Sequence, residues 1–138
     1  MNKMSFVKLI NKVIFFKIFY MHHTLNNLVE IQDKIKNKIK NLEISNYEPK
    51  IIAVSKTFKE KDILPLLNNE HIDFGENKVQ EAVQKWTDLK HKYKKVKLHM
   101  LGKLQTNKVK FAVEVFDYIH SLDSLKLANK LSEEINRK

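Results

Sequence analysis

The sequence predicts an α/β fold with a parallel sheet built from βα units. Along residues 51–136, four short apolar segments of strand type are each followed by a longer amphipathic segment of helix type. Such an alternation requires crossover connections, which are right-handed and place helices against a parallel sheet. With 138 residues, 43% of them hydrophobic, the chain can form one domain with a core but has little room for a second.

The expected elements follow one another with short connections. A helix is expected over residues 24–42, where apolar residues recur at spacings of three and four, and Thr24 is a candidate N-cap. Strands are expected at 51–54, 71–74, 97–101 and 117–120, and the helices after them at 60–69, 78–93, 107–115 and 124–136. The first strand is short, apolar and mostly β-branched, so we expect it to be buried.

Residues 1–20 form a basic and apolar extension ahead of the domain, which we place at 21–138. Lysines interrupt this extension every four or five residues, so it is too short and too broken for a membrane-spanning helix. It also lacks the uninterrupted apolar run and the cleavage site of a secretory signal. A start at Met21 is one explanation of the extension, and a helix lying on a membrane surface is the alternative.

The formal net charge of +10 makes nucleic acid a candidate partner. However, Arg137 is the single arginine among the 26 basic residues, whereas bidentate phosphate contacts favour arginine. We therefore expect no nucleic acid and no membrane span. The absence of cysteine excludes disulfides and thiolate metal sites and fits a reducing compartment, so the expected localisation is cytoplasmic. No spacing of His, Asp or Glu indicates a metal site.

In parallel α/β folds, ligands bind at the carboxyl ends of the strands. Lys56 follows the first strand, where desolvation would favour a neutral amine that is nucleophilic toward an aldehyde; the alternative is a solvated surface charge. Asn77 is a candidate ligand contact or, with Gln80, a cap of the next helix. His99 is a candidate ligand contact or a hydrogen-bonded core histidine. Asp123 or Ser124 is expected to cap the last helix.

Several of these residues lie in segments that, in this order and spacing, resemble the pyridoxal phosphate homeostasis protein family: Ile52–Thr57, Phe74–Glu81, His99–Lys108 and His120–Ser124. The similarity runs from about residue 24 to the C-terminus. The resemblance implies a (β/α) barrel of the TIM type, like the cofactor-binding domain of alanine racemase. It also implies that pyridoxal 5'-phosphate is held as a Schiff base by the lysine ending the first strand, which is Lys56 by position. Asn77 and His99 fall in motifs that the resemblance places in the lining of the pocket.

The resemblance further implies a role in intracellular pyridoxal phosphate homeostasis without catalytic turnover. An enzyme of the alanine racemase type is an alternative, but it needs a second acid/base group, and Tyr118 lies inside a predicted strand. A closed barrel needs eight strands and the sequence predicts four, so we expect an incomplete barrel of about four βα units. In the family the phosphate is gripped by later strands, so weakened cofactor binding is expected.

The partners expected from the resemblance are pyridoxal phosphate, apo-enzymes that receive it, and a chain that supplies the other half of the barrel. A truncated fragment without independent function is the remaining alternative. It would expose sheet edges and apolar surface.

Overall fold

The computed structural model describes residues 22–137, which divide into two compact units between Tyr47 and Glu48. In the first unit, helix α2 (His23–Asn41) confirms the predicted amphipathic helix. The expected N-cap was wrong: the helix begins one residue earlier, and the ring of His22 accepts a hydrogen bond from the backbone N–H of Thr24 at 3.4 Å. The predicted extension at residues 1–20 lies outside the described residues.

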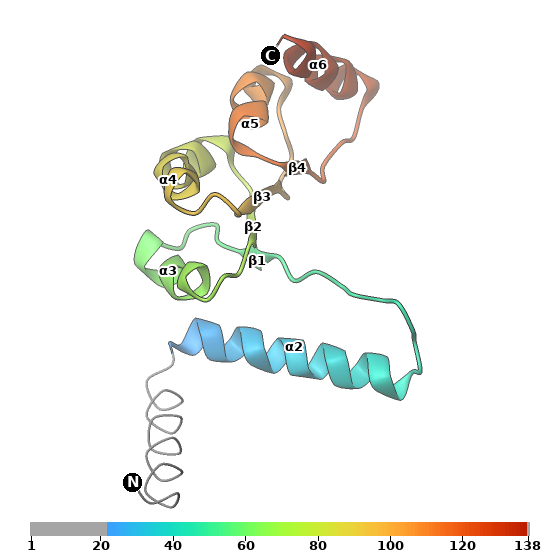
Figure 1. The fold of residues 1–138 in the computed structure, drawn as a ribbon. Helices are drawn as coiled ribbons and strands as arrows, with labels where there is room; N and C mark the ends of the chain where they lie inside the picture. Colours follow the sequence, from blue (N-terminus) through green and yellow to red (C-terminus); the bar gives the residue numbers. More distant parts are fainter. Residues whose placement is uncertain (1–21, 138) are drawn as a thin grey trace, which may run out of the picture. The chain divides into compact units, whose positions relative to one another are not determined.

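The second unit contains a parallel sheet with the strand order β1-β2-β3-β4 (Figure 1). The strands are β1 (Ala53–Val54), β2 (Asp73–Glu76), β3 (Lys97–Met100) and β4 (Tyr118–Ile119). The helices are α3 (Glu60–Asn68), α4 (Val79–Lys92), the 3₁₀ turn η1 (Thr106–Lys108) with α5 (Val109–Val115), and α6 (Leu125–Asn136). This sequential order, with a helix after each strand, is that of four successive units of a TIM-type barrel. The predicted fold class, an incomplete (β/α) barrel, is confirmed.

Within residues 48–137, helices cover one face of the sheet, and no helix of this range covers the other, which we call the uncovered face. Side chains alternate between the faces of a strand, so Phe74 and Glu76 lie on the side of α4, where the rings of Phe74 and Trp86 are 4.9 Å apart. The register Val54–Gly75–His99–Tyr118 lies on the opposite side. The core fills the helix side, and its largest fully buried members are Trp86, Phe74, Leu98, Met100, Leu127, Glu76 and Val109.

Two expectations about the strands need correction. The first strand is not buried throughout, because Val54 points to the uncovered face and is 44% exposed. The second strand begins at Asp73, two residues later than predicted, because His71 still takes part in the turn that ends α3, where its N–H donates to the carbonyl of Leu66 at 3.1 Å. The strand consequently continues through Gly75 and Glu76.

Ser124 caps α6, as expected, with its hydroxyl oxygen accepting from the N–H of Leu127 at 3.3 Å. Among residues 22–137, no helix combines the length and the apolar character needed to cross a membrane.

The single tryptophan joins the apolar core to a buried carboxylate. Trp86 is fully buried, and its indole N–H donates to Glu76 Oε1 at 3.0 Å. We expect Trp86→Phe to lower the free energy of unfolding by about 1–3 kcal/mol, because it removes one donor from a buried charged acceptor. Urea unfolding followed by circular dichroism measures this, with Phe111→Leu on the exposed side of α5 as the control. Equal stability of Trp86→Phe and wild type would contradict the role given to this hydrogen bond.

Candidate functional site

Polar residues lie at or near the carboxyl ends of the four strands. Lys56 and Asn77, which sequence reasoning selected, follow β1 and β2, and His99 lies within β3. His120, which sequence reasoning did not select, follows β4. The ends of β2 and β3 approach each other closely at Gly102, where a Cβ atom would lie 2.3 Å from the backbone oxygen of Asn77. Glycine is therefore required there by the proximity of the neighbouring backbone. This close approach fixes the position of the Asn77 backbone relative to the end of β3.

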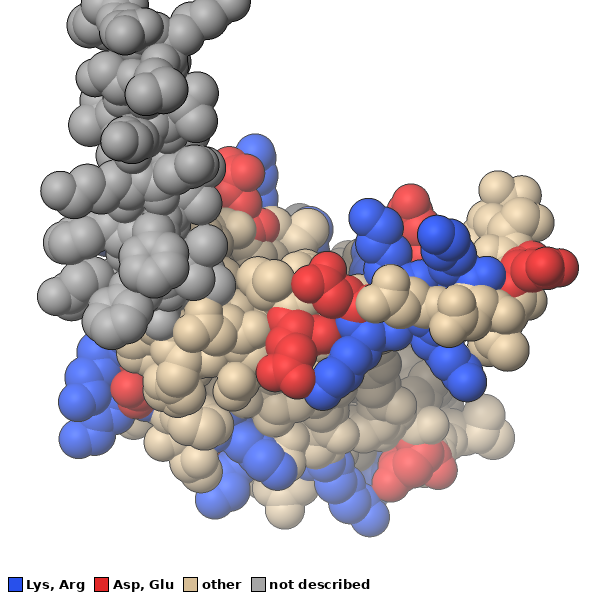
Figure 2. Space-filling view, turned by 90° about the horizontal axis from the view of Figure 1, so that it is seen from below, with Lys and Arg blue, Asp and Glu red and all other residues tan. Residues whose placement is uncertain are grey.

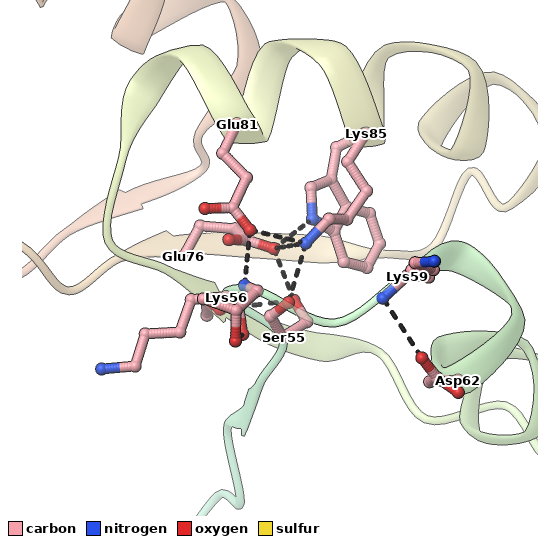
Figure 3. Close-up of polar contacts among 10 residues, drawn as sticks. Ser55, Lys56, Lys59, Asp62, Glu76, Glu81 and Lys85 are labelled. Carbon is pink, nitrogen blue, oxygen red and sulfur yellow. Dashed lines mark hydrogen bonds and ion pairs between the residues drawn. The ribbon is translucent and has the colours of Figure 1, made fainter.

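Lys56 has an exposed side chain, in contrast to the desolvated amine expected from sequence. Among the residues that the structure describes, none accepts a hydrogen bond from its amine. Figure 3 shows this side chain pointing away from the group formed by Glu76, Glu81 and Lys85. The amine is thus accessible, while the backbone that carries it belongs to a tightly bonded turn.

A buried carboxylate lies under this turn, on the helix side of the sheet. The side chain of Glu76 is fully buried. Its Oε1 atom accepts hydrogen bonds from Ser55 Oγ at 2.7 Å, Lys85 Nζ at 3.0 Å and Trp86 Nε1 at 3.0 Å. Its Oε2 atom is buried and has no partner among the described residues. Because an unpaired buried charge is costly, the ammonium group of Lys85, only 12% exposed, is the counter-charge that allows Glu76 to be buried.

Lys85 connects this carboxylate to the backbone before Lys56 and to a second carboxylate. Its Nζ atom donates to the carbonyl of Ser55 at 2.7 Å and to Glu81 Oε1 at 3.1 Å, in addition to Glu76. An ammonium group has three protons, so all three are engaged. The arrangement therefore specifies a lysine at this position.

Glu81 binds the backbone after Lys56. Its Oε1 atom accepts from the N–H of Thr57 at 2.5 Å (Figure 3). This hydrogen bond, together with Lys85, lowers the pKa of the Glu81 carboxyl below its usual value, against the opposing effect of desolvation. Thr57 has a φ of 66°, in the left-handed region. For a β-branched residue this conformation costs about 1–3 kcal/mol and persists only where its surroundings enforce it.

On the uncovered face of the sheet, a second group of polar side chains is linked in a hydrogen-bonded row, which we call the polar chain. His99 Nε2 is 3.0 Å from Asp73 Oδ1, and His99 Nδ1 is 2.9 Å from His120 Nε2. The His99 ring also stacks on Tyr118, with ring centroids 4.6 Å apart. Asp73 and His99 are buried, whereas His120 is exposed. Both ring nitrogens of His99 are therefore occupied, and the exposed end of the chain is His120.

Asn77 does not cap α4, which was the alternative to a ligand contact. The N-cap is Lys78, and its side chain makes no capping hydrogen bond. Asn77 is half-buried at the end of β2. Its amide is consequently left for another role at this edge of the sheet.

Two surface hollows lie along the helices and not at Lys56. One, of about 340 Å³, is lined by residues of α4 and α5, and the other, of about 440 Å³, by residues of η1 and α6. Neither includes Lys56, Asn77 or His99. On the face drawn in Figure 2, basic and acidic side chains are interspersed. No group of three His, Cys, Asp or Glu residues within the described part of the chain could hold a metal ion.

Sequence reasoning missed His120, Glu81 and Lys85. The alternation of β4 contained a signal for His120, because it places this residue on the same face as Tyr118. For Glu81 and Lys85, the spacing of four on a helix predicts only an ordinary ion pair. Nothing in the local sequence indicates that the pair binds the turn after β1.

No protein-family model matches this chain. Several curated relatives are named pyridoxal phosphate homeostasis protein. The one from Pasteurella multocida is 36% identical over 108 residues, which are 78% of this chain and 46% of the relative. The one from Escherichia coli K12 is 32% identical over 118 residues, which are 83% of this chain and 49% of the relative.

Solved structures give the same assignment. PipY of Synechococcus elongatus PCC7942, solved with PLP bound, matches with a TM-score of 0.61 and 38% identity over 73% of this chain and 48% of PipY. An unknown protein from Bifidobacterium adolescentis matches with a TM-score of 0.73 at 24% identity and supports the fold alone. By sequence and by fold, this chain is therefore a relative of the pyridoxal phosphate homeostasis protein family, and it spans about half the length of the curated relatives it matches.

Proposed function

We propose that this chain binds pyridoxal 5'-phosphate covalently, as a Schiff base on Lys56, and that it serves intracellular pyridoxal phosphate homeostasis. The observation that carries the proposal is the accessible amine of Lys56 at the carboxyl end of β1, on a turn whose backbone is held on both sides. A primary amine in such a position is the group that condenses with an aldehyde. The relatives' names and the PLP-bound PipY structure support the same ligand.

The described residues fit part of this cofactor. Lys56 supplies the amine, and Asn77 supplies an amide at the end of the neighbouring strand. The hydroxyl oxygen of Ser121, just beyond β4, is buried without a partner among the described residues, as expected of a site that gains a partner on binding a polar ligand. When bound, the cofactor would supply an aldehyde and a phosphate. The aldehyde is matched by Lys56, and the resemblance implies that the phosphate is held by later strands of the barrel.

We further propose that the chain carries the cofactor without turning over a substrate. A racemase needs an acid/base group on each side of the reacting carbon. Tyr118 is stacked on His99, and the polar chain ending at His120 is the remaining acid/base candidate on this face. The names of the relatives refer to homeostasis and favour the carrier role. Turnover of an amino acid by the purified chain would overturn it.

The proposed partners follow from the open sheet. Within residues 22–137, β1 and β4 each pair with a single neighbouring strand. Such edges accept further strands, so we propose a polypeptide that supplies the remaining part of the barrel and the phosphate site, and apo-enzymes as recipients of the cofactor. The absence of cysteine keeps the cytoplasm as the proposed compartment.

Lys56 is tested by borohydride reduction of the purified chain with pyridoxal phosphate below one equivalent, followed by peptide mass mapping. We expect label on Lys56 in preference to the other lysines, because its amine is accessible and its turn is ordered. Lys56→Ala should abolish the selective label, whereas Lys78→Ala, an exposed lysine after β2, should not. Label spread evenly over many lysines would contradict the proposal.

We propose that the ring of His99 lines the ligand site at the strand ends and that His99 acts on a ligand only through His120. A carboxylate can only accept hydrogen bonds, so His99 should carry its proton on Nε2, facing Asp73, and His120 should donate from Nε2 to His99 Nδ1. Long-range ¹H–¹⁵N NMR near neutral pH should show both rings protonated at Nε2. Protonation of neutral His99 at Nδ1 would contradict this arrangement.

The close packing at Gly102 gives a test of Asn77. Gly102→Ala should displace the backbone of Asn77, lowering the free energy of unfolding by about 1–3 kcal/mol and also the labelling of Lys56. Asn77→Ala should lower the labelling and leave the stability close to that of wild type. The two variants are compared by urea unfolding and by the labelling assay. Unchanged labelling in both would remove Asn77 from the site.

A further inference from the structure

Resting on the proposed function of Lys56, we infer that Glu81 is a positioning residue: its carboxylate holds the turn after β1 in the conformation that directs Lys56 to the ligand side of the sheet. Glu81 belongs to α4, which follows β2, and not to the βα unit that contains Lys56. The position of the cofactor lysine thus depends on a side chain from the neighbouring unit.

The first step concerns the backbone before Lys56. The N–H of Ser55 donates to the carbonyl of Gly75 at 2.9 Å, and the Ser55 hydroxyl donates to Glu76 Oε1. The carbonyl of Ser55 accepts from Lys85. All the hydrogen-bonding groups of Ser55 are engaged with β2 or α4. The chain therefore enters the turn in a fixed position.

The second step concerns the backbone after Lys56. The left-handed conformation of Thr57 turns its N–H toward Glu81 Oε1, and the Thr57 hydroxyl donates to the carbonyl of Lys56 at 2.6 Å. A threonine does not adopt this conformation without compensation. A charge-assisted hydrogen bond from the N–H of Thr57 to a carboxylate is strong enough to supply that compensation. Without it, we expect the turn to relax and the side chain of Lys56 to lose its fixed direction.

The third step concerns the direction of the Lys56 side chain relative to the polar cluster. Every polar group of the cluster of Ser55, Glu76, Glu81 and Lys85 lies on the helix side, and Figure 3 shows Lys56 extending away from it. The Glu81 carboxylate accepts from the N–H of Thr57 and from Lys85, which also donates to the carbonyl of Ser55. Through these contacts Glu81 acts on the backbone on both sides of Lys56, which makes it a positioning residue.

The test compares Glu81→Ala with Glu81→Gln and with Glu133→Ala. Glu133→Ala is the matched control, because it removes a helix carboxylate paired with a lysine at 3.0 Å, on α6 and away from Lys56. Two quantities are measured: the fraction of borohydride-trapped pyridoxal phosphate carried by Lys56, and the hydrogen-exchange rate of the Thr57 amide. Circular dichroism and urea unfolding establish that each variant is folded.

For Glu81→Ala we expect the rate of Lys56 labelling, relative to the other lysines, to fall by about tenfold, as follows from losing a hydrogen bond to a charged group. The Thr57 amide should exchange faster. Glu81→Gln keeps an oxygen acceptor and should recover part of the selectivity, and Glu133→Ala should match wild type. A purely structural role of Glu81 would lower stability without changing the labelling ratio among molecules that remain folded.

Two failures are distinguishable. Selective labelling of Lys56 in wild type and in Glu81→Ala alike would overturn the positioning role and leave the proposed function intact. Unselective labelling in wild type would overturn the proposed function, and the positioning role with it.

Discussion

The structure around the candidate site depends on one buried charge, the carboxylate of Glu76. A fully buried carboxylate is tolerated only when donors and a counter-charge surround it, and here three side chains from two separate elements provide them: Ser55 after β1, and Lys85 and Trp86 on α4. The requirement to satisfy this charge therefore joins the first two βα units. It also explains why several short polar contacts lie next to Lys56, although the Lys56 amine makes none of those with the described residues.

The two faces of the sheet serve different purposes. The helix face contains the apolar core and the Glu76 cluster, which together stabilise the unit. The uncovered face bears Val54, Gly75, His99 and Tyr118 in register, with the polar chain from Asp73 to His120 across it. In a closed barrel this face would be the interior. The relatives are about twice as long as the matched region. Within residues 48–137 no helix covers this face, and Val54 and Tyr118 on it are each 44% exposed.

The sequence alone predicted the order and type of the elements, since hydrophobic periodicity and short connections are local properties. It also predicted a ligand site at the strand ends and, through the resemblance, the cofactor role of Lys56, which stays a prediction. Burial of β1 was predicted wrongly. An apolar strand of a parallel sheet is normally covered on both faces, whereas Val54 lies on the uncovered face and is 44% exposed. The role of Glu81 was beyond reach for a different reason. The hydrogen bond from the Thr57 N–H to Glu81 joins residues 24 positions apart in the sequence. It also depends on the left-handed conformation of Thr57, which a β-branched residue rarely adopts.

An exposed lysine on a constrained turn implies a particular source of selectivity. The described residues do not bury the Lys56 amine, so desolvation does not distinguish it from the many other lysines of this basic chain. Under the proposed function, the position of Lys56 would do so instead: the backbone on both sides of Lys56 is bound by α4 and β2, and its side chain would be free to meet a ligand at the strand ends. Under the proposed function, such a lysine would bind an aldehyde weakly until other groups hold the rest of the ligand. Contacts from a partner segment to the phosphate would then convert a reactive lysine into a cofactor site.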